Sequence, residues 1–188
     1  MIGGMEQLPT TTSSARLTMR LWEPDDAPAL SAAVTASLEH LRPWMPWAAV
    51  APTAEDEREL IGMFADVWRA GGEAVYGVFA GDAIVGGTGL HRRAGPDTLE
   101  IGYWIHVDHI GRGYATEVSA ALTDVAFTVD GIEFVEIHHD AANVRSAAVP
   151  AKLGFVHVAT RPDIAAAPAE VGEDWTWRVD RDAWLRRT

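Results

Sequence analysis

The pattern of apolar and polar residues in the first third of the chain predicts a strand followed by two helices. Residues 16–21 alternate in the manner of a half-buried strand. Apolar residues then recur at helical spacing after Pro24 and again after Thr53. Thr53 and Asp56 form a capping box of the kind that starts a helix, and the glycine pair at 71–72 is typical of a helix end.

The middle of the chain changes to apolar segments separated by turn residues, which predicts an antiparallel meander. The expected strands are Ala74–Ala80, Ala83–His91 and Leu99–Val107. Gly81-Asp82, between the first two, is typical of a tight hairpin.

The last part reads as strand, glycine turn, helix and strand, which predicts a right-handed crossover between two parallel strands. Its expected elements are a helix over 114–129, a strand over 133–138, a short helix over 144–153, and strands over 155–160 and 175–179. Residues 1–14 are rich in Gly, Ser and Thr and predict a flexible lead, with a single domain over 15–188.

Composition narrows the class of protein. With 188 residues, 48% hydrophobic and 22% charged, the chain fits one soluble globular domain. The absence of cysteine excludes disulfides, thiolate nucleophiles and cysteine-based zinc sites. His106, His109, His138 and His139 do not complete a zinc ligand set, so we expect no metal.

The net charge of −12 argues against nucleic acid and anionic membranes as partners. An acidic surface suits a cationic partner such as an amine, although solubility explains it equally well. The chain start shows no charged region followed by an apolar run, and no stretch reaches the ~20 apolar residues of a membrane span. We therefore expect a cytoplasmic protein.

The turn Gly111-Arg112-Gly113 is the first candidate for chemistry. A glycine-rich turn that opens a helix leaves backbone N–H groups at the positive helix end, which suits a phosphate. No Gly-Lys-Ser/Thr closes the turn, and the third glycine of the dinucleotide fingerprint is missing. The turn alone is equally compatible with an ordinary tight connection, and binding of ATP or NAD there is a remote alternative.

A second motif, further along the chain, helps to interpret the glycine turn. Asn143 and Ser146 begin a short helix that ends in Lys152-Leu153-Gly154-Phe155. Together with the segments 100–105 and 111–117, this motif resembles the GNAT N-acetyltransferase superfamily, and its RimJ/RimL-type branch in particular. The resemblance runs from about Arg16 to Leu185 and includes the Pro- and Trp-rich segment 41–47.

The resemblance implies an α/β (α+β) GNAT fold: a mixed, twisted sheet of six to seven strands flanked by helices, with two central parallel strands splayed around the coenzyme A arm. It also implies acetyl-CoA as cosubstrate, with the pantetheine arm near 105–107 and the pyrophosphate on the backbone amides of 111–115. The implied cofactor-binding residues are Ile105, His106, Val107, Ile110, Gly111, Arg112, Gly113, Tyr114, Ala115, Thr116, Asn143, Arg145, Ser146 and Lys152.

Two positions depart from the family pattern. Ile110 stands where the motif usually has Gln or Arg, but backbone amides hold the phosphate, so we expect binding to survive. Pro150 stands where many relatives carry the Tyr that protonates the leaving thiolate.

The implied catalytic residues are therefore Ser146, Glu100 and Asn143. Ser146 would donate the proton to the thiolate, and Glu100 would act as general base through a water. Asn143 would bond the pantetheine arm or cap its helix. Each also has an ordinary structural explanation, as a surface serine, a surface carboxylate or a simple cap.

The candidates for the acceptor wall are aromatic: Trp44, Trp47, Tyr103 and Trp175, for which core packing is the alternative. The resemblance implies an acceptor that is a protein N-terminal α-amine, as on a ribosomal protein, or a small amine such as an antibiotic. The branch leaves succinyl-CoA as donor and a homodimer open. A non-catalytic acyl-CoA-binding regulatory module is an alternative of another class, which Ile110 and Pro150 would support.

Overall fold

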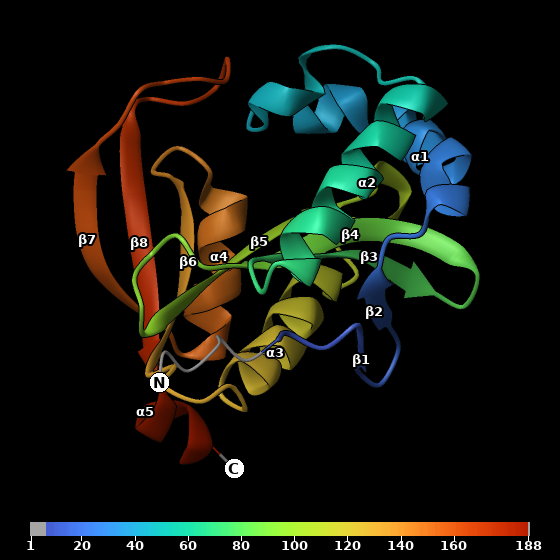
Figure 1. Cartoon of the computed structure of the whole chain (residues 1–188). Helices are drawn as coiled ribbons and strands as arrows, with labels where there is room; N and C mark the ends of the chain where they lie inside the picture. Colours follow the sequence, from blue (N-terminus) through green and yellow to red (C-terminus); the bar gives the residue numbers. More distant parts are fainter. Residues whose placement is uncertain (1–6, 188) are drawn as a thin grey trace.

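The computed structural model describes residues 7–187, which form one eight-stranded sheet with helices on both faces (Figure 1). The strand order is β1-β2-β3-β4-β5-β6-β8-β7. The strands are β1 Thr11–Ser13, β2 Thr18–Leu21, β3 Ala74–Ala80, β4 Ala83–His91, β5 Thr98–Ile105, β6 Phe134–Asp140, β7 Val156–Pro162 and β8 Glu173–Asp180. The helices are α1 Ala27–Leu41, α2 Ala54–Arg69, α3 Tyr114–Ala126, α4 Val144–Leu153 and α5 Arg181–Leu185, with 3-10 turns η1 Pro24–Asp26, η2 Pro46–Ala49 and η3 Val107–His109.

The mixed sheet was predicted, but its strand number was not. Eight strands replace the expected six to seven, and the unforeseen one is β1, inside the predicted lead of residues 1–14. β1 pairs antiparallel with β2, and Leu8 just before it is only 1% exposed. Residues 7–14 of the predicted lead thus contribute a strand and a core residue, which Gly/Ser/Thr composition does not reveal. Residues 1–6 of that lead lie outside the described residues.

β5 and β6 are the parallel pair of the sheet, and they meet only at their starts. Their register holds Thr98 opposite Phe134, Leu99 opposite Val135 and Glu100 opposite Glu136, and no later pair. β5 nevertheless continues to Ile105, paired with β4 alone. The predicted splay between these strands is thus present, and α3 makes the crossover between them.

Two hydrophobic clusters fix the helices to the sheet. One contains Leu99 and Ile101 of β5 with Leu122 of α3 and Val149 of α4. The other contains residues of α1 and α2 packed on Trp22 and Phe79. Because α1 and α2 contact the β3–β4 half of the sheet and α4 contacts β6, the splay between β5 and β6 lies between the two groups of helices.

Most element ends agree with the sequence to within a few residues. α4 spans the predicted 144–153, whereas the helix expected over 114–129 ends at Ala126. There the backbone tightens, since the N–H groups of Thr128 and Val129 bond carbonyls three residues back.

The capping box of α2 offers a first test of the fold. The Thr53 hydroxyl accepts from the Asp56 N–H at 3.1 Å, and the Asp56 carboxylate accepts from the Thr53 N–H at 2.8 Å. Thr53→Ala removes one half of this exchange, so we expect it to lower the free energy of unfolding by about 1 kcal/mol in urea titrations. Thr53→Ser is the matched control and should unfold like the wild type; equal stability of the Ala variant would contradict the role of this cap.

Candidate active site

The turn before α3 leads directly into the helix through two glycines. Gly111 and Gly113 have φ values of +73° and +79°, a left-handed conformation that strains any side chain larger than hydrogen. Gly113 is the N-cap of α3 and supplies no side-chain cap, so the N–H groups of the first turn have no acceptor within their helix. The loop therefore presents backbone donors at a positive helix end, as the sequence predicted.

Arg16 also stands at this loop, and sequence reasoning missed it. Its Nε donates to Glu117 at 2.7 Å, and a terminal nitrogen donates to the Arg112 carbonyl at 3.2 Å. Its guanidinium lies 4.8 Å from the ring centre of Tyr114. Arg16 and Glu117 are 101 residues apart in the chain, so only the folded structure places this positive charge beside the glycine turn.

Two backbone N–H groups in residues 105–107, the predicted site of the pantetheine arm, already have hydrogen-bond partners within the protein. The His106 N–H already donates to the Val85 carbonyl at 2.9 Å. The Val107 N–H donates to the Ser37 hydroxyl at 3.1 Å. An extended ligand along this stretch would therefore have to use backbone carbonyl groups rather than these two N–H groups.

A cavity of ≈ 710 Å³ opens at the splay. Its wall combines α2, the segment after α1, strands β4 to β6 and the start of α4. Six of the predicted catalytic and acceptor residues line it: Trp44, Trp47, Glu100, Tyr103, Asn143 and Ser146.

Other predicted residues lie elsewhere. Trp175 does not line this cavity; its ring stacks on His157 of β7 with the centroids 4.6 Å apart. Lys152 is exposed in the last turn of α4, about 13.5 Å along the helix from Asn143. Arg145 is exposed in the first turn and is likewise absent from the cavity wall.

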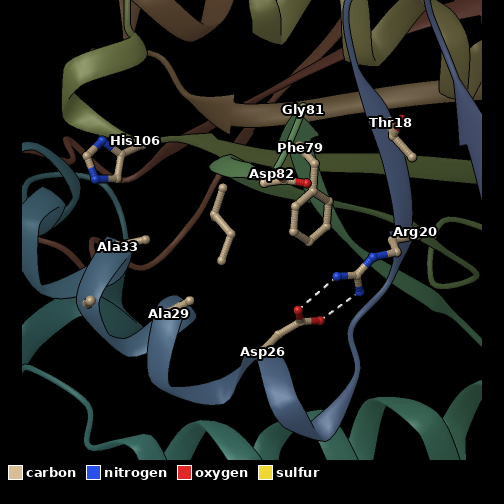
Figure 2. A pocket seen from close by; sticks show the side chains of 11 residues that line it. Thr18, Arg20, Asp26, Ala29, Ala33, Phe79, Gly81, Asp82 and His106 are labelled. Atoms are coloured by element: carbon tan, nitrogen blue, oxygen red, sulfur yellow. Dashed lines mark hydrogen bonds and ion pairs between the residues drawn. The ribbon is translucent and has the colours of Figure 1, made fainter.

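A second cavity of ≈ 590 Å³ lies between α1 and the β3–β4 hairpin (Figure 2). His106 lines one end, and Figure 2 shows the Arg20 guanidinium aligned with the Asp26 carboxylate across the other. The two N–O distances of that pair are 2.7 and 2.8 Å, so both charges are already matched. The residues that sequence analysis selected for catalysis therefore meet in the larger cavity and not in this one.

The start of α4 brings two hydroxyl groups together. Asn143 caps the helix, its side-chain oxygen accepting from the Ser146 N–H at 3.1 Å, so the cap role predicted for it is confirmed. The Tyr103 hydroxyl of β5 lies 3.0 Å from the Ser146 Oγ and 3.3 Å from the Ser146 carbonyl. Burial raises the pKa of Tyr103 to about 12, so its phenol keeps its proton at neutral pH.

Pro150 explains why the Tyr103 hydroxyl fits there. Proline has no N–H, so the carbonyl four residues earlier, that of Ser146, loses its helical hydrogen bond. The Tyr103 hydroxyl occupies this position. The residue that departs from the family pattern is thus coupled to a tyrosine from a different element.

Comparison with known proteins decides the family. A model of the acetyltransferase (GNAT) domain matches residues 16–156. The chain belongs to the GNAT acetyltransferase family. Among curated proteins it resembles YdaF of Bacillus subtilis (strain 168), provisionally named a ribosomal N-acetyltransferase, with 30% identity over 152 residues, covering 78% of this chain and 81% of YdaF.

Solved structures agree on the GNAT fold. A RimL protein, a ribosomal L7/L12 α-N-protein acetyltransferase in complex with coenzyme A, superposes with a TM-score of 0.81 at 20% identity, covering 95% of this chain and 99% of RimL. Mycobacterium smegmatis RimJ, in complex with a CoA disulfide, gives 0.81 at 20% identity, covering 94% and 88%.

Glu100, the predicted base of this GNAT enzyme, is held by an arginine. Arg93 donates to the two carboxylate oxygens of Glu100 at 2.8 and 2.5 Å, and Glu100 is buried. A carboxylate accepts about four hydrogen bonds, so this pairing leaves room for a water on Glu100 but fixes its orientation.

The GNAT cavity also holds a charged cluster that sequence analysis did not assemble. His138 of β6 has its Nε2 2.8 Å from Glu136 and its Nδ1 3.1 Å from Asp174 of β8. Burial by itself would lower the pKa of His138, but the hydrogen bonds to Asp174 and Glu136 outweigh it and raise the pKa to about 10. His138 is therefore a cation at neutral pH and does not act as a base.

Glu136 and His138 are two residues apart in β6 and so lie on one face of the strand, which the sequence could have shown. Nothing in the sequence indicated that Asp174 joins them. The residues that the structure describes contain no group of three or more His, Asp or Glu side chains arranged to hold a metal ion. No helix within residues 7–187 has both the length and the apolar character that a membrane span needs.

Proposed function

We propose that this protein transfers the acetyl group of acetyl-CoA to a primary amine, and that the natural acceptor is a protein N-terminal α-amine. The hydroxyl pair of Tyr103 and Ser146 carries the proposal, because it lies in the cavity at the splay of β5 and β6. The names of YdaF, provisionally a ribosomal N-acetyltransferase, and of RimL, a ribosomal L7/L12 α-N-protein acetyltransferase, support the acceptor class.

The backbone of the glycine loop fits the diphosphate of acetyl-CoA. The first-turn N–H groups of α3 would hold it, with Arg112 supplying positive charge nearby, while the charge of Arg16 is matched by Glu117. The thioester supplies an activated acetyl carbon, which the amine nitrogen attacks as the C–S bond breaks.

The thiolate that leaves needs a proton, and Ser146 donates it. The Ser146 hydroxyl recovers a proton from the neutral Tyr103 phenol 3.0 Å away, and the Tyr103 phenolate takes up the proton that the amine releases to the cavity water, so the pair acts as a short relay. The amine releases its own proton to water in the cavity, and Glu100 orients that water while Arg93 holds the carboxylate in place.

A small amine is the second candidate acceptor. The cavity volume of ≈ 710 Å³ falls within the range of small-molecule sites, about 300–1,000 Å³. MccE, a microcin C7 self-immunity acetyltransferase solved with acetyl-CoA and AMP, has the same fold with a TM-score of 0.81 at 16% identity, covering 91% of this chain and 98% of MccE.

Thermal unfolding with acetyl-CoA, followed by free-thiol release, tests the proposed function. A ligand that binds only the folded state at 100 times its dissociation constant adds about 2.7 kcal/mol, so the melting temperature should rise clearly. Thiol should then be released with N-terminal peptides and more slowly with small amines; ATP and NAD serve as control ligands and should give no shift.

The opposite outcomes are informative. No shift at millimolar acetyl-CoA contradicts donor binding and with it the proposed reaction. A shift without thiol release on any amine favours a non-catalytic acyl-CoA-binding module.

A further inference from the structure

Glu57 is a buried carboxylate that the proposed reaction does not use. It lies in the first turn of α2, its side chain lines the larger cavity, and the residue is only 5% exposed. No described residue offers a hydrogen-bond donor to its Oε2. Burial raises the pKa of Glu57, and the neighbouring Asp56 adds to the rise, as expected for a charge taken from water without a partner.

The other carboxylates of the cavity differ from Glu57 in this respect. Each of them accepts a hydrogen bond from the protein, either from a cationic side chain or from backbone N–H groups. These six are Asp56, Glu100, Asp140, Asp163, Glu170 and Asp174. Leaving one buried carboxylate unmatched costs stability, and a ligand with a positive donor at this place would remove that cost.

The wall around Glu57 is suited to an organic cation. Leu60 and Phe64 follow it on the same face of α2, three and seven residues on, and both line the cavity. Trp44 and Trp47 line it from the neighbouring segment. Aromatic rings attract alkylammonium and guanidinium groups through their faces, and a carboxylate beside them supplies the opposite charge.

The position of Glu57 separates it from the reacting amine. α2 packs on α1 and β3, whereas Ser146 belongs to α4, which packs on α3 and β6. The two residues therefore line one cavity from different groups of helices. A group bound at Glu57 is then a second group of the acceptor, beyond the amine that reacts near Ser146.

We propose that Glu57 is a specificity-determining residue that binds a second cationic group of the acceptor, such as a lysine or arginine side chain close to the N-terminal α-amine. This inference rests on the proposed function and narrows its substrate class. It predicts that acceptors with a second positive charge are acetylated in preference to isosteric neutral ones.

Paired acceptors test this preference. The peptide amides Ser-Lys-Ala-Ala and Ser-Nle-Ala-Ala differ by one ammonium group, and 1,4-diaminobutane and n-butylamine provide the same contrast without a peptide. In the wild type, kcat/KM should be about 10- to 100-fold higher for the acceptor with the second positive charge than for its partner, in at least one of the two pairs. The difference should lie mainly in KM. The peptide or the diamine pair shows which kind of molecule carries the second charge.

Glu57→Gln keeps the shape of the side chain and removes its charge, so the ratio should fall close to one. Its melting temperature should rise, because an unmatched buried charge is lost. Glu59→Gln is the matched control: it removes the same charge from the same helix at an exposed position and should keep the wild-type ratio.

Three results would overturn the inference: a wild-type ratio near one in both pairs, an unchanged ratio in Glu57→Gln, or an equal loss of kcat for both members of a pair. The last would place Glu57 at the reacting amine. Calorimetric binding of Ser-Lys-Ala-Ala amide separates the two proposals, since a Glu57-dependent affinity without any turnover would contradict the proposed function and support the inference.

Discussion

Ser146→Ala should lower kcat by about 100- to 1,000-fold, the scale expected when a general acid is removed from a reaction that needs one. Ser146 lines the cavity at the start of α4; its hydroxyl lies 3.0 Å from that of Tyr103, and its backbone N–H donates to the Asn143 side chain. Acetyl-CoA should still raise the melting temperature, because the phosphate loop is untouched. Steady-state thiol release and thermal unfolding measure the two quantities on one sample.

The leaving group provides the sharpest control for this role. An acetyl thioester of a more acidic thiol expels its thiolate without a proton, so it should restore much of the activity lost in Ser146→Ala. Tyr103→Phe should slow the natural thioester less, by about 10- to 100-fold, because Ser146 remains. Equal losses with both thioesters would show that Ser146 only shapes the site.

The second large effect concerns stability and pH. The folded pKa of His138, about 10, exceeds the ordinary value of 6.5, so the proton on His138 binds more tightly in the folded state. Its contribution is fully present below pH 6.5 and is lost as the pH rises through 10. One pKa unit corresponds to 1.36 kcal/mol, so we expect a loss of about 3 kcal/mol or more over this window.

Urea unfolding at a series of pH values between 6 and 10 measures this slope. His138→Gln should remove most of it, since no proton remains to be released. Asp174→Asn should leave an intermediate slope, because Glu136 still lies 2.8 Å from the imidazole. A wild-type slope in His138→Gln would assign the pH dependence to other groups.

The features that the sequence predicted well are local ones. The Thr53–Asp56 box, the Asn143 cap and the glycine turn each lie within a few residues, so backbone geometry alone determines them. The resemblance to a family supplied the splay, which local patterns do not contain. Ser146 and Glu100 also fell correctly into one cavity.

The features that were missed depend on contacts between distant segments. Arg16 reaches the glycine loop only because the β1–β2 segment passes beside α3, and Asp174 reaches His138 only because β8 pairs with β6. The sequence assigned Tyr103 to the acceptor wall but did not reveal its contact with Ser146. That contact depends on Pro150, which leaves the Ser146 carbonyl without a helical hydrogen bond. A single sequence carries no signal for such pairings, since each is set by tertiary packing.

The pairing of β5 with β6 ends after Glu100, so beyond this point the facing sides of the two strands are unpaired edges inside the sheet. Outer edges of a sheet, here β1 and β7, can be reached by another chain. The edges that face the opening after Glu100 are enclosed by the same molecule, and strands sit about 4.8 Å apart where they pair. A ligand that lies between them must bring polar groups of its own, because the backbone groups along these edges lack a partner strand, so the opening selects through the backbone before any side chain selects by chemistry.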